Sequence, residues 1–192
     1  MTMTDTPIAE LGFPDGKRFL IVVGDLLQEP VDCIVNAANG GLSHGGGVAA
    51  AISEAAGPKL EEECASIIRA QGRIPVTKSV VTTAGNLPFK GVIHAVGPRM
   101  GEGDEERKLA RTLVLAFLKA HEREWTSLAF PGISSGIFAV PHDKCARAYL
   151  HAVAEYFELY PESILRTIRL CLFQGSLLEA VEAEVESYRA QE

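Results

Sequence analysis

The residues that could do chemistry gather in a glycine-rich turn, VNAANGGLSHGGGVAAAI, which runs from Val35 to Ile52. Asn39, Ser43 and His44 supply neutral polar groups there, and an apolar run enters the turn while an alanine-rich helical pattern leaves it. The first N–H groups of a helix have no internal partner and carry the positive end of the helix dipole, and glycine lets a ligand approach the backbone. The turn is therefore expected to bind an anion.

A second turn has the same character. It is PGISSGIFAVP, Pro131 to Pro141, and it also joins an apolar strand pattern to a helical one. No Lys or Arg occurs from Leu20 to Pro58 or from Thr126 to His142, so a bound anion would be held by main-chain dipoles and neutral side chains. Two such turns facing each other can cradle a diphosphate. The Gly-Lys-Ser/Thr sequence of a P-loop is absent, and the glycine spacing fits a dinucleotide-binding Rossmann turn poorly.

Several polar residues have a structural alternative to a role in binding. Asp25 follows a glycine at the end of an apolar run, where it could cap a turn, and Asn36 could bond backbone within the glycine-rich turn. His94 lies in an apolar strand pattern and is expected to be a core histidine. Phe173 could belong to the core, although its place at the end of a strand pattern favours a ligand contact.

Serine-hydrolase chemistry is not supported by the sequence. Ser134 or Ser135 could be a nucleophile, but the sequence places no histidine or acidic residue where it would indicate a catalytic triad. The remaining histidines, His121, His142 and His151, fall on helical patterns, where we expect surface or capping positions.

The elements that must position the two turns alternate between strand and helix patterns. Strands are expected at 19–23, 32–37, 79–83, 92–96, 127–130 and 167–173, and helices at 48–56, 58–71, 105–123, 142–159 and 177–189. This alternation predicts an α/β fold, a three-layer α/β/α sandwich around a mixed, mostly parallel sheet of six or seven strands. Ligands of such sheets bind beyond the carboxyl ends of the strands, where both turns would lie.

Size and charge narrow the classes of function. A chain of 192 residues favours one domain, which we assign to residues 17–192, with a flexible leader at residues 1–16. With 47% hydrophobic and 22% charged residues, the composition is that of a soluble globular protein. The net charge of −7 argues against sequence-independent binding of nucleic acid, but it leaves room for a small anion in a local pocket.

The four cysteines are scattered without metal-ligand spacing, and they are Cys33, Cys64, Cys145 and Cys171. Buried free thiols are the expected state, which indicates a reducing compartment. No apolar run reaches about 18 residues, and the N-terminal residues are too polar for a signal peptide. We therefore expect an intracellular protein of the cytoplasm, the nucleus or both, with no membrane contact and no bound metal.

The segments GDLLQEPVDCIVNAANGGLSHGGGVAAAI, IHAVGP and LAFPGISSGIF, in this order, resemble the macrodomains, a family of ADP-ribose-binding modules. The resemblance covers residues 18–188. The SHGGGVA form and the run GRIPVTKSVVTTAGNLPFKGVIHAVGPR are most similar to the tandem macro modules of some vertebrate mono-ADP-ribosyltransferases, and also to archaeal and coronaviral macrodomains.

The resemblance implies roles for the adenine and diphosphate sites. Asp25 would accept a hydrogen bond from the adenine amine, the N–H of Leu26 would reach a ring nitrogen, and Phe173 would lie against the adenine face. The diphosphate would be held from both sides by the two turns. The residues concerned are Gly46, Gly47 and Val48, with Gly45 beside them, and Ser134, Ser135, Gly136, Ile137 and Phe138.

At the distal ribose, the resemblance implies that Asn39 bonds the hydroxyls and that Phe138 packs nearby. His44 and Ala49 would border the point where an attached protein leaves. In the best-known hydrolytic branch of the family an Asp stands where Ala49 stands here, which argues against general-base catalysis by the protein. Catalytic roles therefore fall to Asn39, which would orient the ribose, and to His44, which would give polar support.

Two functions stay open from the sequence. The chain binds ADP-ribose and mono-ADP-ribosylated proteins and hydrolyses the ester that joins ADP-ribose to Glu or Asp, or it is a non-catalytic reader that recruits partners to modified proteins. In either case we expect a monomer with no resident cofactor.

Overall fold

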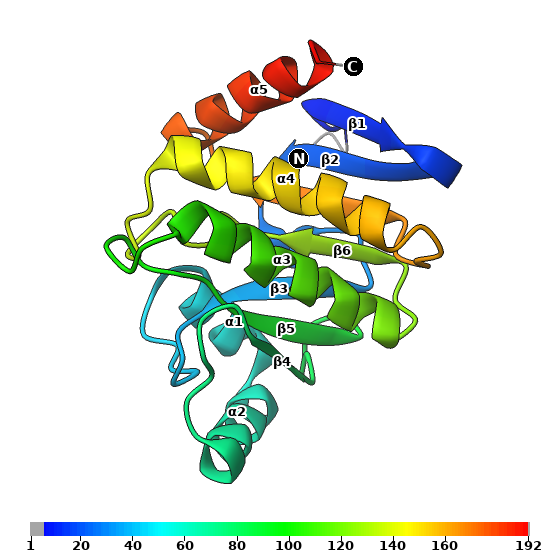
Figure 1. The fold of residues 1–192 in the computed structure, drawn as a ribbon. Helices are drawn as coiled ribbons and strands as arrows, with labels where there is room; N and C mark the ends of the chain where they lie inside the picture. The colour runs from blue at the N-terminus through cyan, green and yellow to red at the C-terminus, as the bar shows by residue number, and fades with distance from the viewer. Residues whose placement is uncertain (1–5, 192) are drawn as a thin grey trace.

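The computed structural model describes residues 6–191. The seven strands in this range form one mixed sheet in the order β1-β2-β7-β6-β3-β5-β4 (Figure 1). The strands are β1 Ala9–Phe13, β2 Lys17–Val23, β3 Cys33–Ala38, β4 Ser79–Thr82, β5 Gly91–Val96, β6 Ser127–Phe130 and β7 Thr167–Leu172. The α-helices are α1 Gly47–Ala56, α2 Pro58–Gln71, α3 Glu105–Glu122, α4 His142–Leu159 and α5 Ser176–Arg189.

Helices cover both faces of the sheet, with α3, α4 and α5 on one face and α1 and α2 on the other (Figure 1). Strand β2 shows how the sequence specifies this arrangement. Phe19 and Ile21 belong to the core under α3, α4 and α5, whereas Leu20 and Val22 belong to the core under α1 and α2. A strand buried on both sides needs apolar residues at successive positions. The α/β/α sandwich predicted from the sequence is confirmed, with seven strands.

The five inner strands are parallel, so their carboxyl ends meet at one edge of the sheet. Strands β1 and β4 are antiparallel edge strands. β3 and β6 are neighbours, and the helices that follow them, α1 and α4, lie on opposite faces. A crevice opens at such a switch point, beyond the carboxyl ends of the strands. The fold therefore brings together the two turns that follow β3 and β6.

The expectation of a flexible leader at residues 1–16 is wrong for its second half. Ala9–Phe13 is strand β1, which pairs with β2 from Ala9 opposite Ile21 to Phe13 opposite Lys17, and residues 1–5 lie outside the described residues. The five residues of β1 alternate between less and more exposed positions, but Leu11 is the single buried one among them, so the pattern is too short to predict the strand from its residues.

The other elements begin and end within two residues of their expected positions. All four cysteines are free and buried, as expected. None of the helices within residues 6–191 combines the length and the apolar character that a membrane crossing requires.

Candidate functional site

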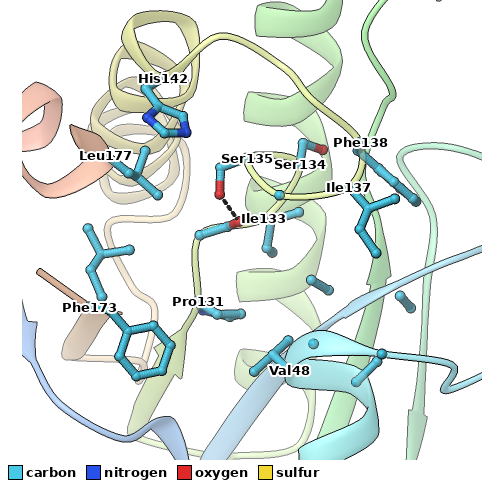
Figure 2. A pocket seen from close by; sticks show the side chains of 18 of the residues that line it. Val48, Pro131, Ile133, Ser134, Ser135, Ile137, Phe138, His142, Phe173 and Leu177 are labelled. Carbon is cyan, nitrogen blue, oxygen red and sulfur yellow. Dashed lines mark hydrogen bonds between the residues drawn. The ribbon is translucent and has the colours of Figure 1, made fainter. Parts of the chain in front are cut away.

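A pocket of about 690 Å³ opens at the carboxyl ends of the parallel strands, within the size range of small-molecule sites. Segments that follow β3, β5, β6 and β7 line it. They are Asn39, Ser43 and Gly45–Ala49, then Arg99, then Pro131–Phe138 with His142, and finally Phe173–Leu177; Ala37, Ala38, Cys171 and Leu172 complete the wall. In Figure 2, Val48 and Ser135 lie on opposite sides of this pocket, and Phe173 and Phe138 lie at opposite ends.

The start of helix α1 forms one side of the pocket. Gly47 has a φ of +60°, which L side chains rarely adopt. A Cβ added at Gly45, Gly46 or Gly47 would meet no atom within 4 Å, so this backbone faces open space. The N–H groups of the first turn of α1 have no acceptor inside the helix and sit at the positive end of its dipole. They are donors available to an anion.

The turn after β6 forms the opposite side, and its serine side chains are used to build it. The Ser134 hydroxyl donates to the carbonyl of Pro98 at 2.7 Å, and the Ser135 hydroxyl donates to that of Gly132 at 2.5 Å (Figure 2). Across residues 6–191, no acceptor is present for the N–H groups of residues 136–138. Ser134 has a φ of +67°, and backbone strain of this kind clusters at ligand sites. This turn therefore also offers main-chain donors, and its hydroxyls are already paired.

Phe173 lies at one end of the pocket with 78% of its surface exposed, directly after β7. Asp25 and Leu26, expected beside it, are absent from the lining. Asp25 Oδ1 accepts from the N–H of Leu27 at 2.9 Å and caps the short 3₁₀ helix η2, Leu26–Gln28. The capping role weighed for Asp25 is thus present, and its contact with a ligand stays a prediction. Leu26 is buried.

Asn39 lines the pocket, but its side chain braces its own turn. Oδ1 accepts from the N–H groups of Gly41 and Ser43 at 3.1 Å each, and Nδ2 donates to the carbonyl and the hydroxyl of Ser43 at 2.9 Å each. An asparagine that bonds backbone a few residues on stabilises a turn. The expected bonds to a ribose would therefore replace, or compete with, bonds that hold the turn in shape.

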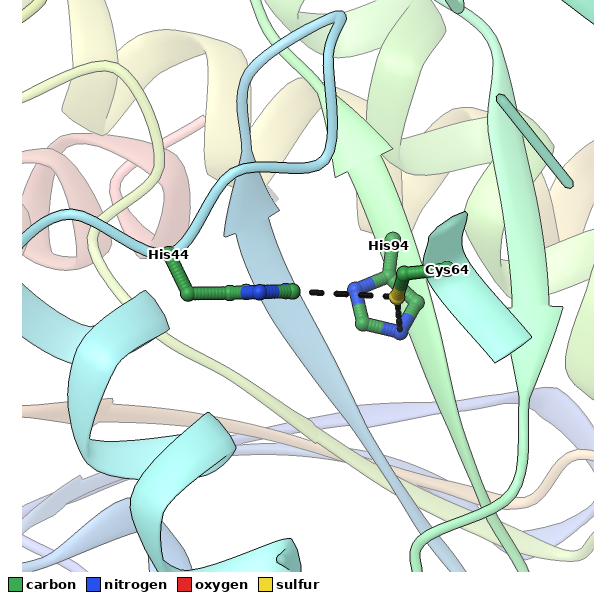
Figure 3. A group of neighbouring side chains, drawn as sticks. All are labelled: His44, Cys64 and His94. Carbon is green, nitrogen blue, oxygen red and sulfur yellow. Dashed lines mark hydrogen bonds between the residues drawn. The ribbon is translucent and has the colours of Figure 1, made fainter. Parts of the chain in front are cut away.

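His44 is the clearest departure from the expected site. It is not among the residues that line the pocket, and its side chain is 5% exposed. The imidazole lies near Cys64 and His94 (Figure 3). Its Nδ1 is 3.6 Å from a carboxylate oxygen of Glu61. The residues between Asn39 and Gly45 turn this side chain toward helix α2, away from the pocket, and a contact of His44 with the distal ribose stays a prediction.

His94 is the fully buried core histidine that the sequence predicts. Its Nδ1 lies 3.0 Å from the Asn36 amide nitrogen and its Nε2 lies 2.8 Å from the Thr82 hydroxyl. Burial, with a smaller effect of His44, lowers the pKa of His94 to about 3, so its ring is neutral. Asn36 therefore bonds this ring rather than the turn backbone that was expected.

The lining residues that the sequence analysis did not assign to the site include Arg99 and His142. Arg99 follows β5, and its guanidinium carbon lies 4.3 Å from the centre of the Phe138 ring. The signal was the VGPR sequence at the end of a buried strand, at the same sheet edge as the turns. His142, expected on a helix surface, lines the pocket, and its Nδ1 lies 2.8 Å from the Ser176 hydroxyl.

The described lining of the pocket contains few charged or reactive side chains. No Asp or Glu is found among the lining residues described, and Arg99 is the single Lys or Arg there. Burial raises the pKa of the Cys171 thiol to about 12, so this thiol stays protonated. The wall therefore offers main-chain donors, one cation and aromatic faces.

Comparisons with known proteins agree with this arrangement. The family model described as Macro domain matches residues 35–149. The human protein mono-ADP-ribosyltransferase PARP14 is 36% identical over 176 residues, which are 90% of this chain and 9% of that protein. An O-acetyl-ADP-ribose deacetylase of Escherichia fergusonii is 41% identical over 152 residues, which are 77% of this chain and 86% of that enzyme. The chain likewise spans 26% of a Thermotoga maritima relative.

Among solved structures, the Oceanobacillus iheyensis macrodomain with ADP superposes with a TM-score of 0.86 at 28% identity, covering 96% of this chain and 98% of that one. A mutant of the same macrodomain has been solved with ADPR. With the family model matched over more than half of its length, and with this fold, the chain belongs to the macrodomain family.

Proposed function

We propose that the pocket binds ADP-ribose, with the pyrophosphate between the start of α1 and the turn after β6. The observation that carries this proposal is the pair of main-chain segments with unpaired N–H groups, Gly47–Ala49 and residues 136–138, on opposite sides of one pocket. Such donors suit an anion at close approach, and the glycines leave the room for it.

The ends of the pocket suit the two halves of the ligand. Phe173 offers an exposed aromatic face on which adenine can stack. At the other end, Phe138 and Asn39 would border the distal ribose, and Arg99 would add a positive charge there. The ligand-bound structures of the O. iheyensis macrodomain support this assignment.

We extend the proposal to mono-ADP-ribosylated proteins. The pocket is open to solvent beside Ile137, whose surface is 88% exposed, and this residue follows the serines of the second turn. A distal ribose at that end could remain attached to a protein outside the pocket. The likeness of this chain to a segment of PARP14 supports the same class of ligand.

A second candidate function is hydrolysis of an ester on the distal ribose, as in a Glu or Asp linkage. The E. fergusonii relative, named as an O-acetyl-ADP-ribose deacetylase, favours it. Water would attack the acyl carbon, the bond from that carbon to the ribose oxygen would break, and a carboxylic acid and a ribose hydroxyl would form. Because none of the lining residues within 6–191 is a carboxylate, the water would have to be positioned by the ligand and the main chain.

Calorimetry with ADP-ribose against AMP tests the binding proposal. If both turns and the distal ribose site are used, ADP-ribose binds at least about 10-fold more tightly than AMP, which is a difference of about 1.4 kcal/mol. Equal affinities would contradict the proposal, because AMP lacks the second phosphate and the distal ribose.

A label assay separates the hydrolase from the reader. A protein carrying labelled ADP-ribose on Glu is incubated with the chain, and the retained label is followed over time. Release of label at a rate that rises with enzyme concentration supports hydrolysis. Tight binding of the modified protein with full retention of label supports the reader.

A further inference from the structure

A group of three potential metal ligands lies behind the wall of the pocket (Figure 3). Cys64 Sγ of helix α2 is 4.0 Å from His44 Nε2 and 3.8 Å from His94 Nε2 of strand β5. All the ligand atoms lie within 4.8 Å of one another, and all three side chains are buried. The three residues are far apart in the sequence, which is why linear spacing did not indicate a metal site.

The separations are close to those of a coordinated ion. Zinc bonds of about 2.3 Å to sulfur and about 2.0 Å to nitrogen, at the tetrahedral angle, place these two atoms roughly 3.6 Å apart. The sulfur–nitrogen distances of 3.8 and 4.0 Å exceed this by only a few tenths of an ångström. The two imidazole nitrogens lie within 4.8 Å of each other, against roughly 3.3 Å for two such bonds at the tetrahedral angle. Side-chain rotations that bring the three atoms onto one ion must therefore also draw the two rings together.

The atoms behind the two rings also suit coordination. Metal-bound histidines usually present their other N–H to an oxygen. His44 Nδ1 lies 3.6 Å from Glu61 Oε1, and Glu61 is itself held by the Ser53 hydroxyl. His94 Nδ1 faces the side-chain amide of Asn36 at 3.0 Å.

The side-chain amide of Asn36 determines which ring nitrogen of His94 carries the proton. Its Oδ1 is buried and has no partner among the described residues, while Nδ2 faces His94. The two ends of a side-chain amide have nearly the same shape, so a half-turn of the amide places Oδ1 against His94 Nδ1. That ring nitrogen then carries the proton, which leaves a lone pair on His94 Nε2, the atom that lies 2.8 Å from the Thr82 hydroxyl and 3.8 Å from Cys64 Sγ.

The two histidines are already in the protonation state that binds a metal ion, and the thiol reaches it when the ion binds. Burial lowers the pKa of both histidines, to about 3 for His94, so both rings are neutral and keep a lone pair. Burial also raises the pKa of the Cys64 thiol to about 11, so the thiol is protonated in the free chain and an ion has to displace that proton on binding. The Thr82 hydroxyl, now 2.8 Å from His94 Nε2, keeps its bond to the Thr83 carbonyl when the ring turns to the ion.

We propose that His44, Cys64 and His94 form a Zn²⁺ site, with water or the Thr82 hydroxyl in the fourth position. One thiolate and two neutral imidazoles are a ligand set that this ion favours. The ion would tie the glycine-rich turn to α2 and β5. Because Ser43 and Gly45, the neighbours of His44, line the pocket, the ion would hold one pocket wall in place from behind.

The test uses the full chain, stripped with a chelator and then titrated with Zn²⁺ against a chromophoric competitor. We expect one Zn²⁺ per chain and, with Co²⁺ as the probe, a thiolate-to-cobalt charge-transfer band. Cys64→Ala should lose both signals and weaken Zn²⁺ binding by at least about 100-fold. Cys33→Ala, which removes another fully buried thiol from the neighbouring strand β3, is the matched control and should keep both.

The folded state of each variant is checked by circular dichroism. His44→Gln gives a second measurement if Cys64→Ala fails to fold, and it should also lose the Zn²⁺ stoichiometry. A folded wild-type chain that binds less than one tenth of an equivalent of Zn²⁺, or equal Zn²⁺ binding by wild type and Cys64→Ala, would overturn the proposal. ADP-ribose binding is measured separately, so either proposal can fail alone.

Discussion

At the residue scale, the site depends on two aromatic side chains at opposite ends of the pocket. Phe173 is more exposed than its apolar character favours, and Phe138 is held under the guanidinium of Arg99. Large exposed apolar side chains that line a cavity indicate a ligand surface. The turns alone predicted a binding site without charged side chains. The structure adds one cation, Arg99, which follows the neighbouring strand β5.

Phe173→Ala should weaken ADP-ribose binding without unfolding the chain. Stacking of a base on an aromatic ring contributes about 1–3 kcal/mol, so the dissociation constant should rise roughly 5- to 150-fold. Calorimetry measures the change. Leu159→Ala removes another large exposed apolar side chain, 55% exposed at the end of α4, and should leave the affinity unchanged. Equal affinity for Phe173→Ala and wild type would place adenine elsewhere.

Two substitutions separate the contribution of the positive charge of Arg99 from that of its planar contact with Phe138. Arg99→Ala should lower ADP-ribose affinity several-fold and reduce its dependence on salt, because Arg99 is the single Lys or Arg in the part of the lining that the structure describes. Arg99→Lys keeps the charge but gives up the planar contact with Phe138, so it should retain the salt dependence. Titrations at low and high salt compare them, with Arg111→Ala on the exposed side of α3 as the control. An unchanged salt slope in Arg99→Ala would argue against a charge contact.

At the scale of elements, the turn after β6 is fixed by its contact with the end of β5. A Cβ added at Gly97, directly after β5, would meet Ser134 Oγ at 2.4 Å and Ile133 Cγ2 at 2.9 Å. Ser134 donates to the Pro98 carbonyl across the same contact. The two chain segments can approach this closely only because Gly97 has no side chain.

Gly97→Ala should therefore displace the second turn and lower ADP-ribose affinity by at least about 10-fold, which is about 1.4 kcal/mol. Gly12→Ala is the matched control, since an added Cβ there meets nothing within 4 Å and β1 lies at the far edge of the sheet. Affinity is measured by calorimetry and folding by thermal denaturation. Retained affinity in a folded Gly97→Ala chain would show that the turn tolerates the shift.

The elements were predictable where their residues repeat with a clear period. The inner strands and all five α-helices follow from apolar runs and helical spacing, whereas β1, with one buried side chain, does not. Within the site, the sequence located the glycines and the serines because turn chemistry is local. It did not indicate that the His44 side chain packs toward α2, because the direction of a side chain in a loop depends on what the fold packs beside it.

At the scale of the whole molecule, the strand order assembles a site from four distant segments. Arg99 and His142 could not be assigned to the pocket from the sequence, because their distance from the turns depends on the pairing of β5 with β3 and of β6 with β7. The same pairing gathers His44, Cys64 and His94. Sequence patterns indicate elements and turns, but contacts between distant elements need the topology.

The net charge of −7 leads to a prediction for the whole chain. Binding to nucleic acid without sequence preference requires Lys and Arg to displace counterions, so mixed-sequence single-stranded DNA should not bind measurably at physiological salt. Fluorescence anisotropy of a labelled oligonucleotide measures this. Binding that weakens steeply with added salt would contradict the prediction and indicate a basic surface.

The central claim is that two turns, after β3 and after β6, hold one diphosphate with main-chain N–H groups. Titration of ¹⁵N-labelled protein with ADP-ribose, followed by amide chemical shifts, tests it most directly. We expect the amides of Gly47–Ala49 and of residues 136–138 to shift together, with one shared dissociation constant. Shifts confined to one of the two turns, or absent from both while ADP-ribose binds, would contradict it.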